Sequence, residues 1–226
     1  MLAGWRSEIR DSNYDYLLVL NDDVLLFPDS IQTLIDVARM AVQAGCCTIA
    51  VAANFTDGKS TTYGALRRSS RFNPVAFKQS PAPSTPQLAH TLNMNCALIS
   101  RCALDTIGFL SPVFRHTGGD YDFGLRLRRA GGQVWQAPGH QGYCERNSIC
   151  GSSMDSSLSV ATRVKRLLGV KEAPLVQRAT YAFRHGGLAA PLVFVSPYVR
   201  LLASAALNSP ACMQIRKSLT LWWGRR

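Results

Sequence analysis

The sequence predicts an α/β fold, in which short buried strands alternate with amphipathic helices. Two continuous aliphatic runs, at residues 15–20 and 48–53, have the length of single strands. Runs of this kind are typical of strands inside a parallel sheet. Between them, residues 31–42 place Ile, Leu, Ala and Val at helical spacing, after Pro28 and before Gly45. Proline near the start and glycine past the end mark the limits of a helix.

The same patterns continue along the chain. We expect a hairpin turn at Asp57-Gly58 and a long surface loop from residues 67 to 86, which are rich in Ser, Pro and Arg. The further predicted elements are a strand at 91–100, a short helix at 101–107, a helix at 120–130 and a strand at 133–137. Phe123, Leu125 and Leu127 are expected on the buried side of the third helix.

A change in composition predicts two domains, residues 1–150 and 151–226. Beyond Ser152 the strands give way to helical patterns rich in Leu, Ala, Val and Arg, near 155–169, 173–186, 191–207 and 209–223. The net charge of the 226-residue chain is +11, and most of the excess lies in this second part. A basic helical region suits an anionic membrane surface or phosphate-bearing substrates better than nucleic acid. The alternative is that these helices pack on the domain or on a partner subunit.

The cysteines favour a reducing environment. There are seven, with no CxxC motif, and the N-terminus shows no long apolar signal region. We therefore expect a cytoplasmic protein, peripheral on the inner face of the membrane if its basic region binds lipid.

Two acidic clusters carry the predicted chemistry. The first, Asn21-Asp22-Asp23, follows the first strand, at the edge where open α/β sheets bind ligands. Mg²⁺ or Mn²⁺ takes one or two carboxylates together with the phosphates of a nucleotide. Asn and Asp also start turns and helices, so this motif alone is equally typical of a helix entry.

The second cluster is Asp120-x-Asp122-x-x-x-Arg126, after Gly118-Gly119. Asp122 and Arg126 stand four residues apart and can pair on a helix. Asp120, in the first turn, is then free to accept the proton of an attacking hydroxyl, while the glycines let a sugar approach the backbone. The alternative is an N-capping Asp beside a surface ion pair. Asn93 and Asn95 on the preceding strand either line the site or satisfy buried backbone groups.

These residues together resemble glycosyltransferase family 2, which has the GT-A fold. The chain is similar to a bacterial surface-polysaccharide subgroup with His-x-x-Gly-Asp-x-Asp-Tyr-Gly-x-Arg and Ser-Pro-Tyr-x-Arg motifs. The matching residues are His116, Gly119, Asp120, Asp122, Gly124, Arg126 and residues 196–200. The resemblance covers about residues 14–205. It implies a GT-A-like, Rossmann-like mixed sheet flanked by helices, with a helical C-terminal extension.

The resemblance also implies site roles. Asp120, Asp122 and Arg126 are the expected catalytic group, with Asp120 as base and the other two ordering the helix. Asn21, Asp22, Asp23, His116 and Gly119 are expected at the donor and its cation.

The chain departs from the family pattern at three places. Gly119 replaces a Glu beside the base, and Cys144 occupies the slot of a metal-binding His, for which His140 is a nearby substitute. His116 could instead orient the acceptor or a phosphate. The acidic pair also comes at residue 22, whereas a nucleotide-binding βαβ segment of about sixty to eighty residues normally precedes it. We therefore expect an N-terminally truncated family member.

The predicted function is metal-dependent transfer of a sugar, with inversion, from a nucleoside-diphosphate sugar to a glycan or lipid-linked hydroxyl. Two alternatives stay open. One is a catalytically incompetent remnant that only binds an acceptor, a membrane or a partner. The other is a metal-dependent phosphohydrolase that uses the same carboxylates. Against it, the sequence shows neither a glycine-rich loop that would hold a phosphate nor a His/Asp metal-binding motif.

Overall fold

The computed structural model describes residues 13–172 and 174–207 and confirms a mixed α/β fold. The chain divides into two compact units, Met1–Arg146 and Asn147–Arg226. The strands all belong to the first unit as far as the described residues go, and the second unit is helical there. Each unit is described by itself below.

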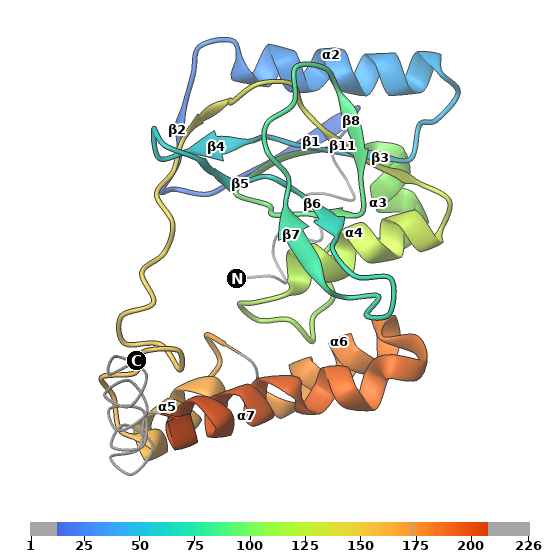
Figure 1. Cartoon of the computed structure of the whole chain (residues 1–226). Coiled ribbons are helices and arrows are strands. Elements are labelled where there is room, and N and C mark those ends of the chain that lie inside the picture. Colours follow the sequence, from blue (N-terminus) through green and yellow to red (C-terminus); the bar gives the residue numbers. More distant parts are fainter. Residues whose placement is uncertain (1–12, 173, 208–226) are drawn as a thin grey trace, which may run out of the picture. The chain divides into compact units, whose positions relative to one another are not determined.

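A five-stranded mixed sheet organises the first unit (Figure 1). Its order is β1 (Tyr16–Leu20), β10 (Cys96–Ser100), β3 (Ile49–Ala52), β11 (Gln133–Gln136) and β8 (Gln87–Ala89). Only β3 and β11 run parallel, and the other three pairs are antiparallel.

Helices cover both faces of this sheet. Alternate side chains of β3 point to opposite sides. Ile49 and Val51 pack against α2 (Ser30–Gln43), while Ala50 and Ala52 belong to the core under α3 (Arg101–Ile107) and α4 (Gly119–Arg129). The result is a three-layer arrangement with the sheet in the middle (Figure 1).

The position of β1 differs from the prediction. Residues 15–20 were expected inside a parallel sheet, but β1 is an edge strand of the five-stranded sheet and pairs antiparallel with β10. Leu17 and Val19 contact one core, Tyr16 and Leu18 the other, so both faces are apolar. A continuous aliphatic run therefore indicates that both faces of a strand pack against apolar side chains. It does not indicate whether the strand has a neighbouring strand on one edge or on both.

The segment predicted as a loop at 67–86 contains a hairpin instead. β6 (Ala65–Arg68) pairs with β7 (Phe77–Gln79) and with β9 (Thr91–Leu92) in a three-stranded sheet. These strands have only two to four residues, too few for a sequence periodicity. The strand expected at 91–100 is accordingly two strands, β9 and β10, separated by residues 93–95.

A small sheet at the edge of the first unit holds four very short strands. Its order is β2 (Leu25–Leu26), β12 (Gly142–Tyr143), β4 (Phe55–Thr56) and β5 (Thr61–Tyr63). The hairpin turn predicted at Asp57-Gly58 joins β4 to β5. A Cβ on Gly142 would lie 2.2 Å from the carbonyl oxygen of Leu25, so only glycine fits between β2 and β4.

The second unit consists of α5 (Val160–Leu167), α6 (Leu175–His185), the 3-10 turn η1 (Gly187–Ala189) and α7 (Ala190–Leu207). Arginine side chains join its helices. Arg163 donates from Nε to the carbonyl of Ser153, at 2.8 Å, and from Nη2 to Ser204 of α7, at 2.7 Å. Arg178 of α6 donates to Ser196 of α7, at 3.0 Å. The helix predicted at 209–223 lies outside the described residues.

Gly124 sets the contact between α4 and β9. A Cβ at this position would meet Oγ1 of Thr91 at 2.5 Å and Cδ2 of Leu92 at 2.9 Å. Alanine is normally about 1 kcal/mol better than glycine inside a helix. At this position we expect the opposite effect. Gly124→Ala should lower the free energy of unfolding by about 1–3 kcal/mol, because the helix must shift away from the strand. Urea unfolding followed by circular dichroism measures it, and an unchanged or higher midpoint would contradict the close contact.

Candidate active site

The first acidic cluster lies on an exposed turn at the end of β1. Asn21, Asp22 and Asp23 are all exposed, and the turn leads directly into β2. The backbone N–H of Asn21 donates to the carbonyl of Asn95, at 2.9 Å. The acidic pair is therefore attached to the chain segment that precedes β10.

That segment, Asn93–Asn95, connects the two acidic clusters. Its first half reaches the second cluster: the Asn93 side chain and the Met94 backbone N–H lie close enough to the carboxylate of Asp120 to lower its pKa. Its second half reaches the first cluster, through the bond to Asn21 and through the Asn95 amide, whose Nδ2 lies 3.8 Å from Sγ of Cys144. Three consecutive residues thus bind groups from both clusters, so Asp22, Asp23 and Asp120 lie at the same end of the sheet.

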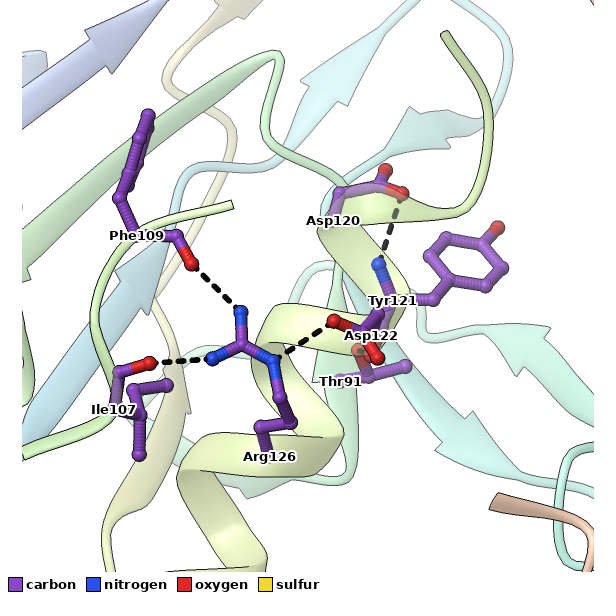
Figure 2. A network of polar contacts seen from close by, with 7 residues as sticks. All are labelled: Thr91, Ile107, Phe109, Asp120, Tyr121, Asp122 and Arg126. Carbon is purple, nitrogen blue, oxygen red and sulfur yellow. Dashed lines mark hydrogen bonds and ion pairs between the residues drawn. The ribbon is translucent and has the colours of Figure 1, made fainter. Parts of the chain in front are cut away.

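Asp120 combines burial with hydrogen bonding. It sits in the first turn of α4, where its Oδ1 accepts the N–H of Tyr121 at 2.8 Å (Figure 2). The residue is half-buried, yet enough protein surrounds the carboxyl group to raise its pKa to about 6. The bonds from residues 93, 94 and 121 oppose this rise and only partly offset it. A carboxylate with a pKa near 6 is well matched to accept a proton near neutral pH.

Asp122 and Arg126 form the predicted ion pair, and it is buried. Arg126 Nε lies 2.8 Å from Oδ2 of Asp122, whose side chain is 0% exposed against 18% for the arginine. The guanidinium also donates to the carbonyls of Ile107, at 2.6 Å, and Phe109, at 2.7 Å (Figure 2). The pair therefore joins α4 to the end of α3. Both residues position the helix that carries Asp120, and neither is placed as a proton acceptor.

The two glycines before Asp120 have structural roles. Gly118 has φ +82°, a left-handed conformation that favours glycine at the helix entry. Gly119 is buried, and a Cβ there would lie 3.2 Å from Cβ of Phe114. A side chain at position 119 would press on Phe114, so this glycine has a packing role, and its contact with a donor sugar stays a prediction. His116 lies two residues before Gly118, exposed in the loop that leads into α4.

Strand register places Cys144 beside the acidic pair and moves His140 away from it. β12 pairs antiparallel with β2, Tyr143 with Leu25 and Gly142 with Leu26. Residues that follow β12 therefore lie toward Asp23, and residues that precede it lie toward Phe27, whose N–H donates to the carbonyl of Gln141. The Cys144 thiol is buried, and burial, followed by the nearby charge of Asp23, raises its pKa. His140, proposed as a metal ligand, hydrogen-bonds instead with Thr61 through Nε2, at 3.0 Å. The antiparallel pairing separates it from Asp23, which argues against that assignment.

A buried amide network holds the segment between β11 and β12. Asn54 is fully buried and donates from Nδ2 to the carbonyls of Ala137, at 2.7 Å, and Gly139, at 3.0 Å. Gln136 donates to Oδ1 of Asn54 at 3.0 Å, and Gln141 accepts the Asn54 backbone N–H at 2.7 Å. Sequence reasoning missed this network, which fixes the path that leads to Cys144.

Aromatic side chains gather at Tyr121, the residue that follows Asp120. The Tyr121 ring packs edge-to-face on Phe77 of β7, with centroids 6.3 Å apart, and the Tyr121 hydroxyl lies 3.4 Å from Nδ2 of Asn93. Burial, then the charge of Asp120, raises the pKa of Tyr121, and Tyr63 adds a smaller contribution. Aromatic walls with a few polar groups are typical of small-molecule sites. The hairpin that supplies Phe77 was expected to be a loop, so this cluster was not predicted.

The residues present fit a cation that is held partly by one or two carboxylates and partly by a bound substrate. Within the described part of the chain, no three His, Cys, Asp or Glu side chains gather into a metal site of their own. Mg²⁺ commonly needs only one or two protein carboxylates, since substrate phosphates and water complete its shell. The exposed carboxylates of Asp22 and Asp23 suit that mode, whereas the Cys144 thiol is too soft a ligand for this ion.

Comparison with known proteins adds no family assignment: no family model matches the chain, and no curated protein matches it significantly. The arrangement of its own side chains therefore carries the functional conclusion.

The ion pair gives a test of burial with a matched control. Arg101 and Asp105 of α3 form a pair at the same four-residue spacing and at 2.9 Å, but their side chains are 32% and 63% exposed. We expect Asp122→Ala to lower the free energy of unfolding by about 3–5 kcal/mol, because it leaves a largely buried guanidinium without its charge partner. Asp105→Ala should cost less than about 1 kcal/mol. Equal losses in chemical denaturation would show that the buried pair does not hold α4 on α3.

Proposed function

We propose that the first unit is the catalytic part of a metal-dependent glycosyltransferase, similar to family 2 enzymes of the GT-A fold. It would move a sugar from a nucleoside-diphosphate sugar to a hydroxyl of a glycan or lipid-linked acceptor, with inversion. One observation carries this proposal: Asn93–Asn95 bind both the turn that bears Asp22 and Asp23 and the buried carboxylate of Asp120. An exposed acidic pair at the same end of the sheet as a proton acceptor supports such a transfer.

Asp120 serves as the base in this scheme. Its carboxylate accepts the proton of the acceptor hydroxyl while that oxygen forms the new bond to the anomeric carbon. The bond between that carbon and the diphosphate oxygen breaks on the opposite face, which inverts the centre. Asn93 and the Met94 N–H hold the carboxylate in place. The Asp122–Arg126 pair fixes the turn of α4 from which Asp120 projects.

Asp22 and Asp23 would hold Mg²⁺ or Mn²⁺ together with the donor diphosphate. When bound, the cation supplies neutralisation of the negative charge that develops on the departing diphosphate. Asn21 keeps this turn in place through its bond to Asn95. His116, in the exposed loop before α4, is our candidate for contact with a donor phosphate or the acceptor.

The aromatic cluster of Tyr63, Phe77 and Tyr121 is proposed as the wall against which a sugar ring packs. Phe77 and Tyr121 are in contact, and Tyr121 follows the proposed base directly. A sugar ring has an apolar face and polar edges. A site with aromatic rings on one side and Asn93 with Asp120 on the other matches both. The reaction is proposed to take place in the cytoplasm.

Substitution of the base should separate catalysis from stability. The elevated pKa means that the fold favours the protonated carboxyl, so ionisation of Asp120 costs stability as pH rises from about 4 to about 6. We expect Asp120→Asn to abolish release of nucleoside diphosphate from a panel of nucleotide sugars. It should also raise the free energy of unfolding at pH 7.5, by up to about 3 kcal/mol, with no gain near pH 4.

For the wild-type chain, kcat/KM should fall below about pH 6, as the base becomes protonated. Transfer that survives in Asp120→Asn, or a profile flat down to pH 5, would remove Asp120 from this role. Failure of the wild-type chain to bind any donor would favour the alternative, a module that binds without catalysing.

The acidic pair can be tested against a nearby exposed acid. Asp22→Asn and Asp23→Asn should each weaken Mn²⁺-dependent donor binding at least tenfold, because each removes a charged ligand. Asp29, also exposed and just before α2, is the control, and Asp29→Asn should leave the affinity unchanged. Isothermal titration with donor in the presence and absence of Mn²⁺ measures both. Equal affinities for all three variants would show that Asp22 and Asp23 do not hold the cation.

A further inference from the structure

One side of α7 is apolar from its start to Leu202. Large aliphatic side chains recur every three or four residues from η1 to residue 202, and all are exposed: Leu188 (106%), Leu192 (72%), Val195 (41%), Val199 (56%) and Leu202 (61%). This spacing puts them on one face of a helix. The opposite side, with Ala190, Val193 and Leu201, is buried inside the unit.

α6 adds exposed apolar groups of the same kind. Val176 (71%) and Phe183 (64%) stand seven residues apart, two turns along one face. We name the five side chains of η1 and α7 the apolar face, to which Val176 and Phe183 add exposed apolar groups on α6. Soluble monomers rarely expose so many large apolar side chains together, and such surfaces usually contact a membrane or another protein.

The charge of the second unit decides between these partners. Residues 147–226 hold 11 of the 25 Lys and Arg residues but only Asp155 and Glu172 of the 14 acids. A second copy would bring the same positive charge to the contact and be repelled. A surface that is apolar inside and negative outside is complementary, and an anionic lipid bilayer has both properties.

Three arginines on α7 or bound to it decide how α7 meets the bilayer. The segment Gly187–Ser204 is long and apolar enough to cross a membrane by length and composition. However, Arg178 binds Ser196 in the middle of α7, Arg163 binds Ser204 near its end, and Arg200 belongs to the helix itself. Within the described residues none of the three is in an ion pair. A crossing α7 would carry these cations into hydrocarbon, which costs several kcal/mol for each.

We propose that the apolar face docks on an anionic phospholipid bilayer, with α6 and α7 lying in the plane of the interface. The aliphatic side chains enter the boundary between headgroups and acyl chains. The guanidinium groups stay on the other side of α7 or reach the lipid phosphates. This proposal does not rest on the glycosyltransferase assignment, since its test measures binding alone.

The test uses the full chain and vesicles of phosphatidylcholine, either alone or with roughly one third phosphatidylglycerol, a mixture with a negative surface. In co-sedimentation we expect strong binding only to the mixed vesicles, weakened at high salt. The double variant Leu188→Ser/Leu192→Ser should lower the partition coefficient at least tenfold. Both leucines are exposed, so thermal unfolding should stay unchanged. The control is Phe72→Ser, because Phe72 is 91% exposed but belongs to the first unit.

Several results would overturn the proposal. Equal binding by the double variant and the wild type would show that the apolar face does not contact the membrane. Equal binding to neutral and mixed vesicles would show that charge does not contribute. A dimer in sedimentation velocity without lipid, dispersed by the double variant, assigns the face to a second copy. Resistance of the bound protein to extraction at alkaline pH shows that α7 crosses the bilayer.

Discussion

The contacts of Asn93–Asn95 are the constraint on which the first unit depends. This segment interrupts what would otherwise be one long strand, and its groups bind the turn after β1, the buried thiol of Cys144 and the carboxylate of Asp120. In a regular strand the backbone groups of these residues would form hydrogen bonds with the adjacent strands. The interruption releases them for three segments that are far apart in the sequence. The positions of the acidic turn, Cys144 and Asp120 relative to one another follow from it.

Local signals in the sequence predicted the elements near the site well. Asp122 and Arg126 were expected to pair because four residues make one helical turn, and the pair forms. The limits of α2 follow from Pro28 and Gly45, and those of α4 from the glycines at both of its ends. Such predictions succeed because each depends on residues within one or two turns of each other.

Long-range contacts were not predictable in the same way. The expectation of one strand at 91–100 failed because the partners of residues 93–95 are 26 to 74 positions away in sequence, and nothing local marks them. His140 was expected to substitute for Cys144 as a metal ligand, but the register of β12 on β2 places it away from Asp23. The Asn54 and Gln136 amides lie 82 positions apart and each, alone, resembles an ordinary surface residue. Their pairing depends on the folded core that buries both.

The narrow passage of β12 between β2 and β4 limits how the protein can change. Gly142 leaves no room for a side chain, and the strand has only two residues, so its register is fixed by backbone contact alone. Successive strand residues point to opposite faces. Loss or gain of one residue between Gly142 and Cys144 would therefore turn the thiol to the opposite face of the sheet. A different side chain would then lie beside Asp23. Natural variants are consequently expected to exchange residue types at position 144 while keeping its distance from the glycine constant.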